Sequence, residues 1–203
     1  MTFLTTVLSG LGTFFLYLWA LFLHWLWIFA VSFVSPNSIW IIIPIWASWF
    51  FAEFFQEKRG TSFGNAISNG VVPFWVGIDW LRQLTNQVTA AHLEFSGLLL
   101  IKYLISVIAI VFGLIIVIEG IKGTSFIRFV GRIRVVTYFL VMFTPIVYGI
   151  IDPNFMYIFS TLLFFPLFYF LIEFICQKIP EPKAMLLDGQ NKKKSFDDMK
   201  YYK

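Results

Sequence analysis

The feature that most constrains this chain is a series of uncharged apolar stretches, the first of which runs from Thr2 to Val34. Apolar stretches of about 20 residues recur after it, and that length matches the ~30 Å hydrocarbon layer of a bilayer. Only 13% of the residues are charged, against about 25% in soluble domains. The sequence therefore predicts an all-α integral membrane protein and excludes a water-soluble domain.

About six transmembrane helices are expected, each ending at a turn signal or at charged residues. The expected spans cover residues 12–34, 39–55, 63–79, 97–118, 133–151 and 155–175. The third span is the weakest because amides, serine and Pro73 interrupt it. Residues 80–95 place their apolar side chains on one helical stripe, which predicts an amphipathic helix that follows the third span and lies along the membrane surface or against the bundle.

Basic residues set the expected orientation through the positive-inside rule. In a six-span layout, residues 58–59, the cations of residues 122–134 and the lysines of the tail fall on one side. Both termini are therefore expected in the cytoplasm. Residues 1–178 form a single transmembrane helical bundle in this interpretation, and residues 179–203 form a cytoplasmic polar tail. The tail residues Lys192, Lys193 and Lys194 are expected to contact anionic lipid.

Two turns of the chain share a short sequence. Residues 60–63 read Gly-Thr-Ser-Phe, residues 123–126 repeat these letters, and a glutamate precedes each copy. Spans two and three then resemble a shortened copy of spans four and five, which suggests a parallel two-helix repeat. Gly-Thr-Ser is also common before a helix, where Ser or Thr serves as the N-cap. The sequence leaves both interpretations open.

Three carboxylates lie near the expected cytoplasmic ends of spans: Glu53, Glu57 and Glu119. They are candidate interfacial groups, because an ionisable side chain at the bilayer centre costs at least ~2.5 kcal/mol. One interpretation brings Glu53 and Glu119 together in a carboxylate cluster for a cation or a proton. The favoured interpretation makes all three end caps that pair with nearby lysines and arginines.

The third span is the most polar crossing, so its side chains are candidates for a water-filled path or for interhelical contacts. The candidates are Asn65, Ser68, Asn69, Asp79 and Arg82. Asp79 and Arg82 are three residues apart, share a helical face and are expected to form an ion pair.

Catalytic signatures are absent from the sequence. It has no His-x-x-x-His, no Gly-x-Ser-x-Gly and no phosphate-binding loop, and Cys176 is its single cysteine. The histidines, His24 and His92, have no spacing that brings them together as haem ligands. We therefore expect no enzyme activity, no metal, no cofactor and no nucleic-acid partner.

Two functions fit these observations. The first is a structural or accessory subunit of a membrane assembly, whose partners are the lipid bilayer and other membrane chains or copies of itself. The alternative is a small oligomeric channel or transporter that uses the polar third span.

Overall fold

The structure is a computed structural model that describes residues 3–58, 60–91, 96–180 and 183. Every regular element within these ranges is a helix. The helices are α1 (Phe3–Val31), α2 (Pro36–Phe55), α3 (Phe63–Ala91), α4 (Gly97–Ile121), α5 (Ile127–Val130), α6 (Ile133–Val147) and α7 (Phe155–Lys178).

Four helices of the described part are long and apolar enough to cross a membrane. They comprise residues Ser9–Val31, Pro36–Phe55, Gly97–Ile121 and Phe155–Lys178. The chain is therefore a multi-pass membrane protein, as predicted. Of the other two predicted spans, α6 is apolar but too short to count as such a helix. Helix α3 is long enough but not apolar enough.

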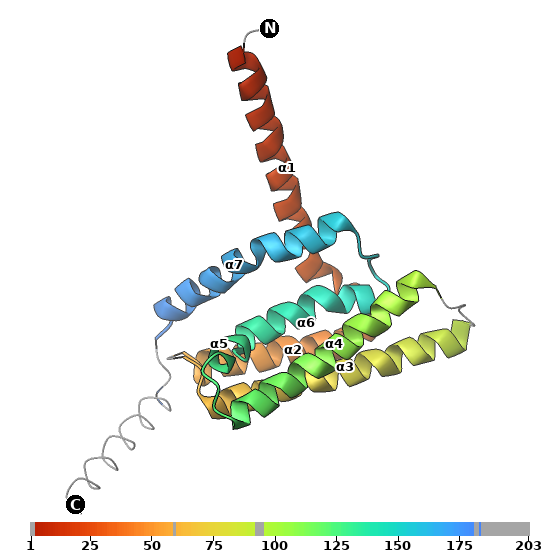
Figure 1. The fold of residues 1–203 in the computed structure, drawn as a ribbon, viewed down its shortest axis with the longest axis vertical. Coiled ribbons are helices and arrows are strands. Elements are labelled where there is room, and N and C mark those ends of the chain that lie inside the picture. Colours follow the sequence, from red (N-terminus) through yellow and green to blue (C-terminus); the bar gives the residue numbers. More distant parts are fainter. Residues whose placement is uncertain (1–2, 59, 92–95, 181–182, 184–203) are drawn as a thin grey trace, which may run out of the picture.

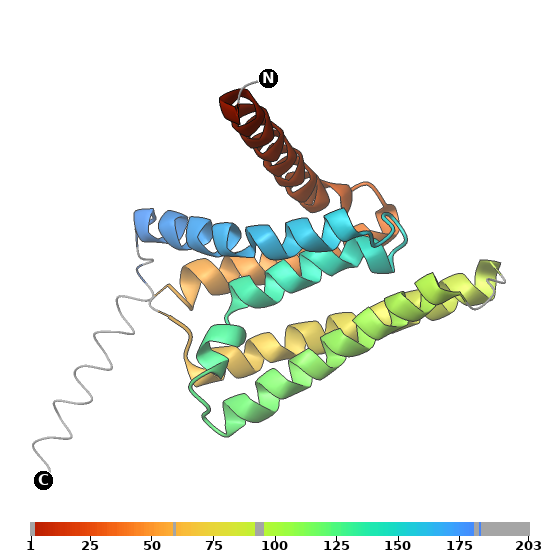
Figure 2. The same ribbon diagram turned by 45° about the horizontal axis from the view of Figure 1, so that its top comes forward.

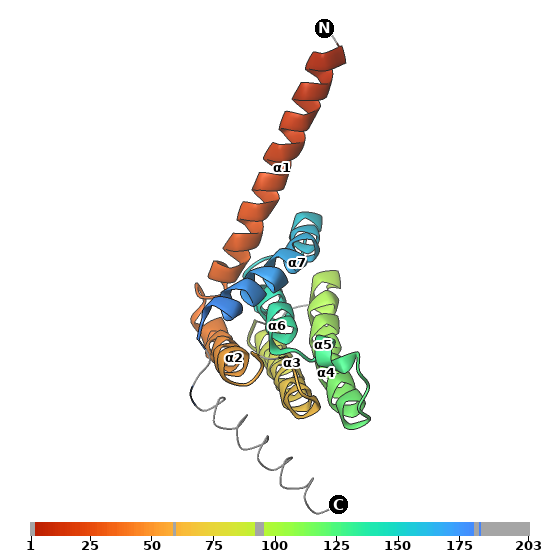
Figure 3. The same ribbon diagram turned by 90° about the vertical axis from the view of Figure 1, so that its left-hand side faces the viewer.

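Helices α2, α3, α4, α6 and α7 run side by side, whereas α1 leaves this group crosswise (Figures 1 and 3). Helix α6 is central and contacts α2, α3, α4 and α7. Its sequence explains that position, because Val136, Leu140, Val141 and Ile146 are fully buried although they lie on different sides of the helix.

Helices α3 and α4 form a close antiparallel pair, seen as the lowest layer in Figure 2. Small residues permit the close approach. A Cβ atom added to Gly113 of α4 would lie 2.5 Å from the backbone nitrogen of Phe74 and 2.6 Å from the carbonyl oxygen of Gly70. A glycine is required at this position because the two backbones touch.

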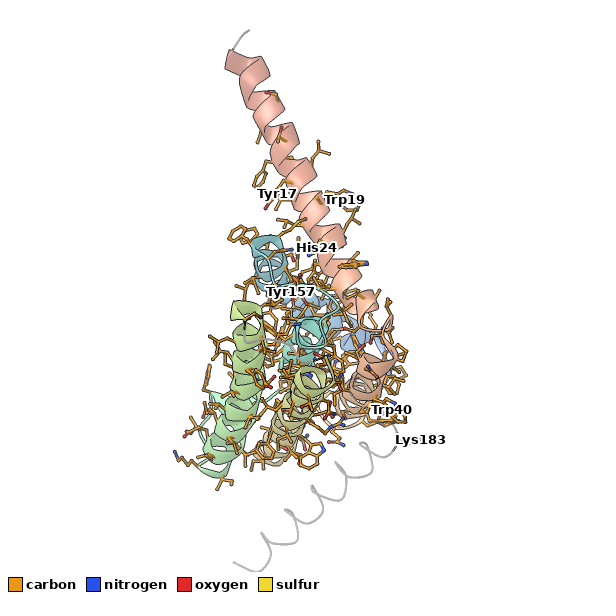
Figure 4. The ribbon with its side chains drawn as sticks, turned by 90° about the vertical axis from the view of Figure 1, so that its right-hand side faces the viewer. Tyr17, Trp19, His24, Trp40, Tyr157 and Lys183 are labelled. Atoms are coloured by element: carbon orange, nitrogen blue, oxygen red, sulfur yellow. The ribbon has the colours of Figure 1, made fainter. Side chains whose placement is uncertain are left out.

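Helix α1 is fixed to the bundle through its C-terminal half. The indole nitrogen of Trp25 donates to the Tyr138 hydroxyl at 2.9 Å, and that hydroxyl donates to the carbonyl oxygen of Thr161 on α7 at 2.5 Å. His24 lies near Tyr157, with ring centres 6.0 Å apart, whereas Tyr17 lies farther out on the helix (Figure 4). Residues 9–17 are exposed throughout.

The predicted break between a third span and a surface helix is wrong. Helix α3 continues without interruption from Phe63 to Ala91, and residues 92–95 lie outside the described part of the chain. No glycine or proline occurs between Ile78 and Ala91 to end the helix, and the buried side chains of Trp80 and Leu84 continue its packed face.

Other boundaries shift by a few residues. Helix α1 ends at Val31 and α4 extends to Ile121. Helix α6 ends at Val147, before the positive-φ residue Gly149. The short helix α5 was not predicted; it occupies part of the turn between α4 and α6.

The two Gly-Thr-Ser turns resemble each other in local geometry. Gly60 and Gly123 have φ values of +104° and +74°, a region that favours glycine. The Thr61 hydroxyl donates to Glu57 at 2.8 Å, and the Thr124 hydroxyl donates to Glu119 at 2.8 Å. Repetition of the whole hairpins remains a prediction.

Candidate functional site

A buried ion cluster lies at the end of the bundle where α2 and α7 end and α6 begins (Figure 1). Arg134, in the first turn of α6, and Glu53, near the end of α2, both have side chains that are 0% exposed. The Nε atom of Arg134 donates to Glu53 Oε2 at 3.1 Å, and its Nη2 atom pairs with Oε1. Its Nη1 atom donates to Glu173 Oε2 of α7 at 2.5 Å. One guanidinium group therefore links three helices.

Two further side chains complete the cluster. Arg132 Nη2 lies 3.3 Å from Glu173 and 3.7 Å from Glu53. The guanidinium carbon of Arg134 lies 4.9 Å from the centre of the Tyr169 ring. Two arginines thus share two glutamates, so the cluster is neutral overall, and each buried charge has a partner of opposite sign.

Glu57 forms a second buried polar site beside the cluster. Its carboxylate accepts hydrogen bonds from the Thr61 hydroxyl at 2.8 Å, the Ile133 backbone nitrogen at 3.1 Å and the Asn69 amide. Burial raises the pKa of Glu57 above its ordinary value, although these three hydrogen bonds act in the opposite direction. The Asn69 amide also donates to the carbonyl oxygen of Gly131 at 2.9 Å, which connects α3 to the turn before α6.

The three predicted interfacial carboxylates have different surroundings. Glu53 pairs with Arg134 and Arg132, rather than with the lysines near it in sequence. Glu119 pairs with Lys122 at 2.6 Å, as the end-cap interpretation expects, and no ion pair or hydrogen bond of the described residues joins Glu119 to Glu53.

The five polar residues singled out on α3 do not converge. The Asn65 amide donates to the carbonyl oxygen of Gln56 at 3.3 Å. Ser68 and Asn69 line a pocket of about 510 Å³ between α2 and α3. Asp79 and Arg82 do not line it; they form the expected ion pair at 2.6 Å, and Asp79 also accepts a hydrogen bond from the Tyr148 hydroxyl at 2.9 Å.

Sequence reasoning missed Arg134 and Glu173 as cluster residues. A signal for Arg134 was present, because it lies inside the predicted span 133–151, where an unpaired charge is costly. Its partner Glu53 is 81 residues earlier in the chain. No local spacing rule connects two residues so far apart.

The arrangement is suited to holding helices together. The Cys176 thiol lies 3.5 Å from Glu53 Oε1 but is buried inside the cluster. In the described part of the chain, no group of three or more His, Cys, Asp or Glu residues could hold a metal ion. His92 lies outside the described residues.

Comparisons of this chain with protein-family models, with curated proteins and with solved structures give no match.

Proposed function

We propose that this protein is a structural or accessory subunit of a membrane assembly and has no catalytic role. The observation that carries the proposal is the Glu53–Arg134–Glu173 cluster, in which two buried charges and one half-buried charge on three helices pair with one another. Asn69 is likewise bonded to Glu57 and Gly131. Polar groups that are paired inside the protein stabilise helix packing and leave few groups free to bind a solute.

The outer half of α1 supports a role in contacts beyond this chain. Phe14, Phe15, Leu16 and Trp19 are all exposed on this part of the helix. Such a surface is suited to lipid, to another membrane chain or to a second copy of the protein. Partners of these kinds are part of the proposal.

A six-crossing layout with both termini in the cytoplasm belongs to the same proposal. It is supported by the charged turns around residues 56–62 and 122–132 and by the end of α7, which gather at one end of the bundle (Figure 1). The positive-inside rule assigns that end to the cytoplasm. Helices α3 and α6 then cross with α2, α4 and α7. The uncharged α1, which runs crosswise to these helices in the structure, supplies the sixth crossing only if it turns to lie parallel with them in the bilayer.

Cysteine labelling tests this topology. Cys176 is the only native cysteine, so Cys176→Ala gives a background for single reporters. We expect Lys122→Cys to resist a membrane-impermeant maleimide added to intact cells, and Arg82→Cys to react with it. The native Lys122 side chain is 60% exposed and the native Arg82 side chain is 64% exposed, so the protein itself shields the two positions to a similar extent. Labelling of Lys122→Cys from outside would contradict the orientation.

A channel or transporter is the second candidate. The pocket of about 510 Å³ between α2 and α3 favours it, because Gln56, Ser68 and Asn69 contribute polar groups to its lining. Under this alternative, the polar side chains of α3 line the path by which the solute crosses the membrane.

An ion-flux assay in liposomes separates the two functions. We expect the wild-type protein to show no more flux than protein-free vesicles, and Asp79→Asn and Ser68→Leu to leave that result unchanged. The first substitution removes the charge of Asp79, and the second narrows the α2–α3 pocket. Wild-type flux that either substitution abolishes would contradict the accessory role and support the transporter.

A further inference from the structure

A second pocket opens at the charged end of the bundle and borders the buried ion cluster, with which it shares Arg132 and Tyr169. It has a volume of about 320 Å³ and lies between the turn before α3, the segment around α5 and the side of α7. The polar side chains that line it are Thr61, Ser125, Arg128, Arg132 and Tyr169. Among the described residues the lining contains two arginines and no carboxylate.

Arg128 supplies this pocket with a positive charge that is free to attract an anion. Its Nε atom donates to the carbonyl oxygen of Thr61 at 2.9 Å, and its guanidinium carbon lies 5.6 Å from the centre of the Phe63 ring. These contacts fix the side chain without neutralising it. In the described part of the chain no carboxylate forms an ion pair with Arg128.

Arg132 is the second arginine of the lining, and it is already paired with a carboxylate. Its Nη2 atom pairs with Glu173 and its Nη1 atom donates to the Tyr169 hydroxyl at 3.4 Å. The Nε atom of Arg132 is buried and has no hydrogen-bond partner among the described residues. This Nε atom is closed to solvent, so a ligand in the pocket would reach Arg132 through the 13% of its side chain that remains exposed.

The donors match one chemical group. Guanidinium groups bind phosphate oxygens through parallel N–H bonds, and the hydroxyls of Ser125 and Tyr169 can donate to a further oxygen. Phe129, which is 49% exposed, lines the same pocket and offers an apolar contact next to the charged groups. The end of apolar helices is also the depth at which phospholipid headgroups lie.

We propose that the pocket between Arg128 and Arg132 binds a phosphate group, carried either by an anionic lipid headgroup or by a free phosphate. This inference does not depend on the proposed accessory role.

The test uses the full chain in neutral detergent, with native mass spectrometry to count bound lipid. Phosphatidylglycerol is expected to bind, and diacylglycerol, which has no phosphate, is not. Arg128→Gln is expected to weaken phosphatidylglycerol binding by about tenfold, the usual effect of losing a charge-assisted hydrogen bond. Ser125→Leu keeps both arginines, narrows the pocket and is expected to weaken binding as well.

Lys122→Gln is the matched control, because it removes one exposed cation from the same end without touching the pocket. It is expected to change affinity by less than about twofold, since charges in water are screened. Displacement of the lipid by millimolar inorganic phosphate would assign the site to free phosphate as well, and resistance to displacement would assign it to the lipid headgroup. Equal binding by wild type and Arg128→Gln, or equal binding of diacylglycerol, would overturn the proposal.

Discussion

Replacing Arg134 with leucine is expected to lower the free energy of unfolding by about 3–5 kcal/mol, the usual loss when one member of a buried ion pair is removed. The Glu53 side chain is 0% exposed and would keep a buried charge, with Arg132 as its remaining ion-pair partner at 3.7 Å. The chain has eight tryptophans, so unfolding in mixed micelles can be followed by intrinsic fluorescence.

Arg82→Leu is the control for this prediction. It breaks the Asp79–Arg82 pair, in which the arginine side chain is 64% exposed. An exposed pair is worth at most about 1 kcal/mol, so this variant should remain close to wild type. Equal losses for Arg82→Leu and Arg134→Leu would show that burial of the cluster has no special effect on stability.

Gly113→Ala is the second substitution with a large expected effect. The added methyl group would lie 2.5 Å from the Phe74 nitrogen and 2.6 Å from the Gly70 oxygen. These are backbone atoms, so relief requires α3 and α4 to move apart, and overpacking of this kind costs about 1–3 kcal/mol. The same fluorescence-detected unfolding experiment measures the loss.

Gly12→Ala provides the matched control, since no described residue lies within 4 Å of a Cβ atom added at this position of α1. Alanine favours a helix over glycine by roughly 0.5–1 kcal/mol, so Gly12→Ala should be neutral or slightly stabilising. A neutral Gly113→Ala would mean that α3 and α4 are not in backbone contact.

The sequence predicted the helical class, the multi-pass character and the gathering of charged turns at one end. These properties follow from local composition and from the alternation of direction between consecutive helices. The Asp79–Arg82 pair was predictable for the same reason, because a spacing of three residues within one helix places both side chains on one face.

The partner of Glu53 was not predictable from local rules. The positive-inside rule counts Arg132 and Arg134 together as loop cations, but it says nothing about which way each side chain turns. In the structure both arginines reach Glu53 and Glu173, because α6 lies between α2 and α7. Which glutamates the two arginines reach depends on how α2, α6 and α7 are each rotated about their own axes.

The continuity of α3 was missed for a different reason. The sequence changes from apolar to amphipathic after Asp79, and such a change predicts the end of a span. The polarity of the side chains depends on what surrounds a helix, whereas the helix itself ends where its backbone hydrogen bonds stop. Trp80 and Leu84 remain buried in the same helix, so its packed face passes through the change in polarity.

A double-mutant cycle between Glu53 and Arg134 tests most directly whether the buried charged groups of this protein stabilise the fold by pairing with one another. The double variant Glu53→Leu/Arg134→Leu is predicted to have a larger free energy of unfolding than Arg134→Leu alone, because Glu53→Leu removes the charge that Arg134→Leu leaves buried. A double variant whose loss equals the sum of the two single losses would contradict it.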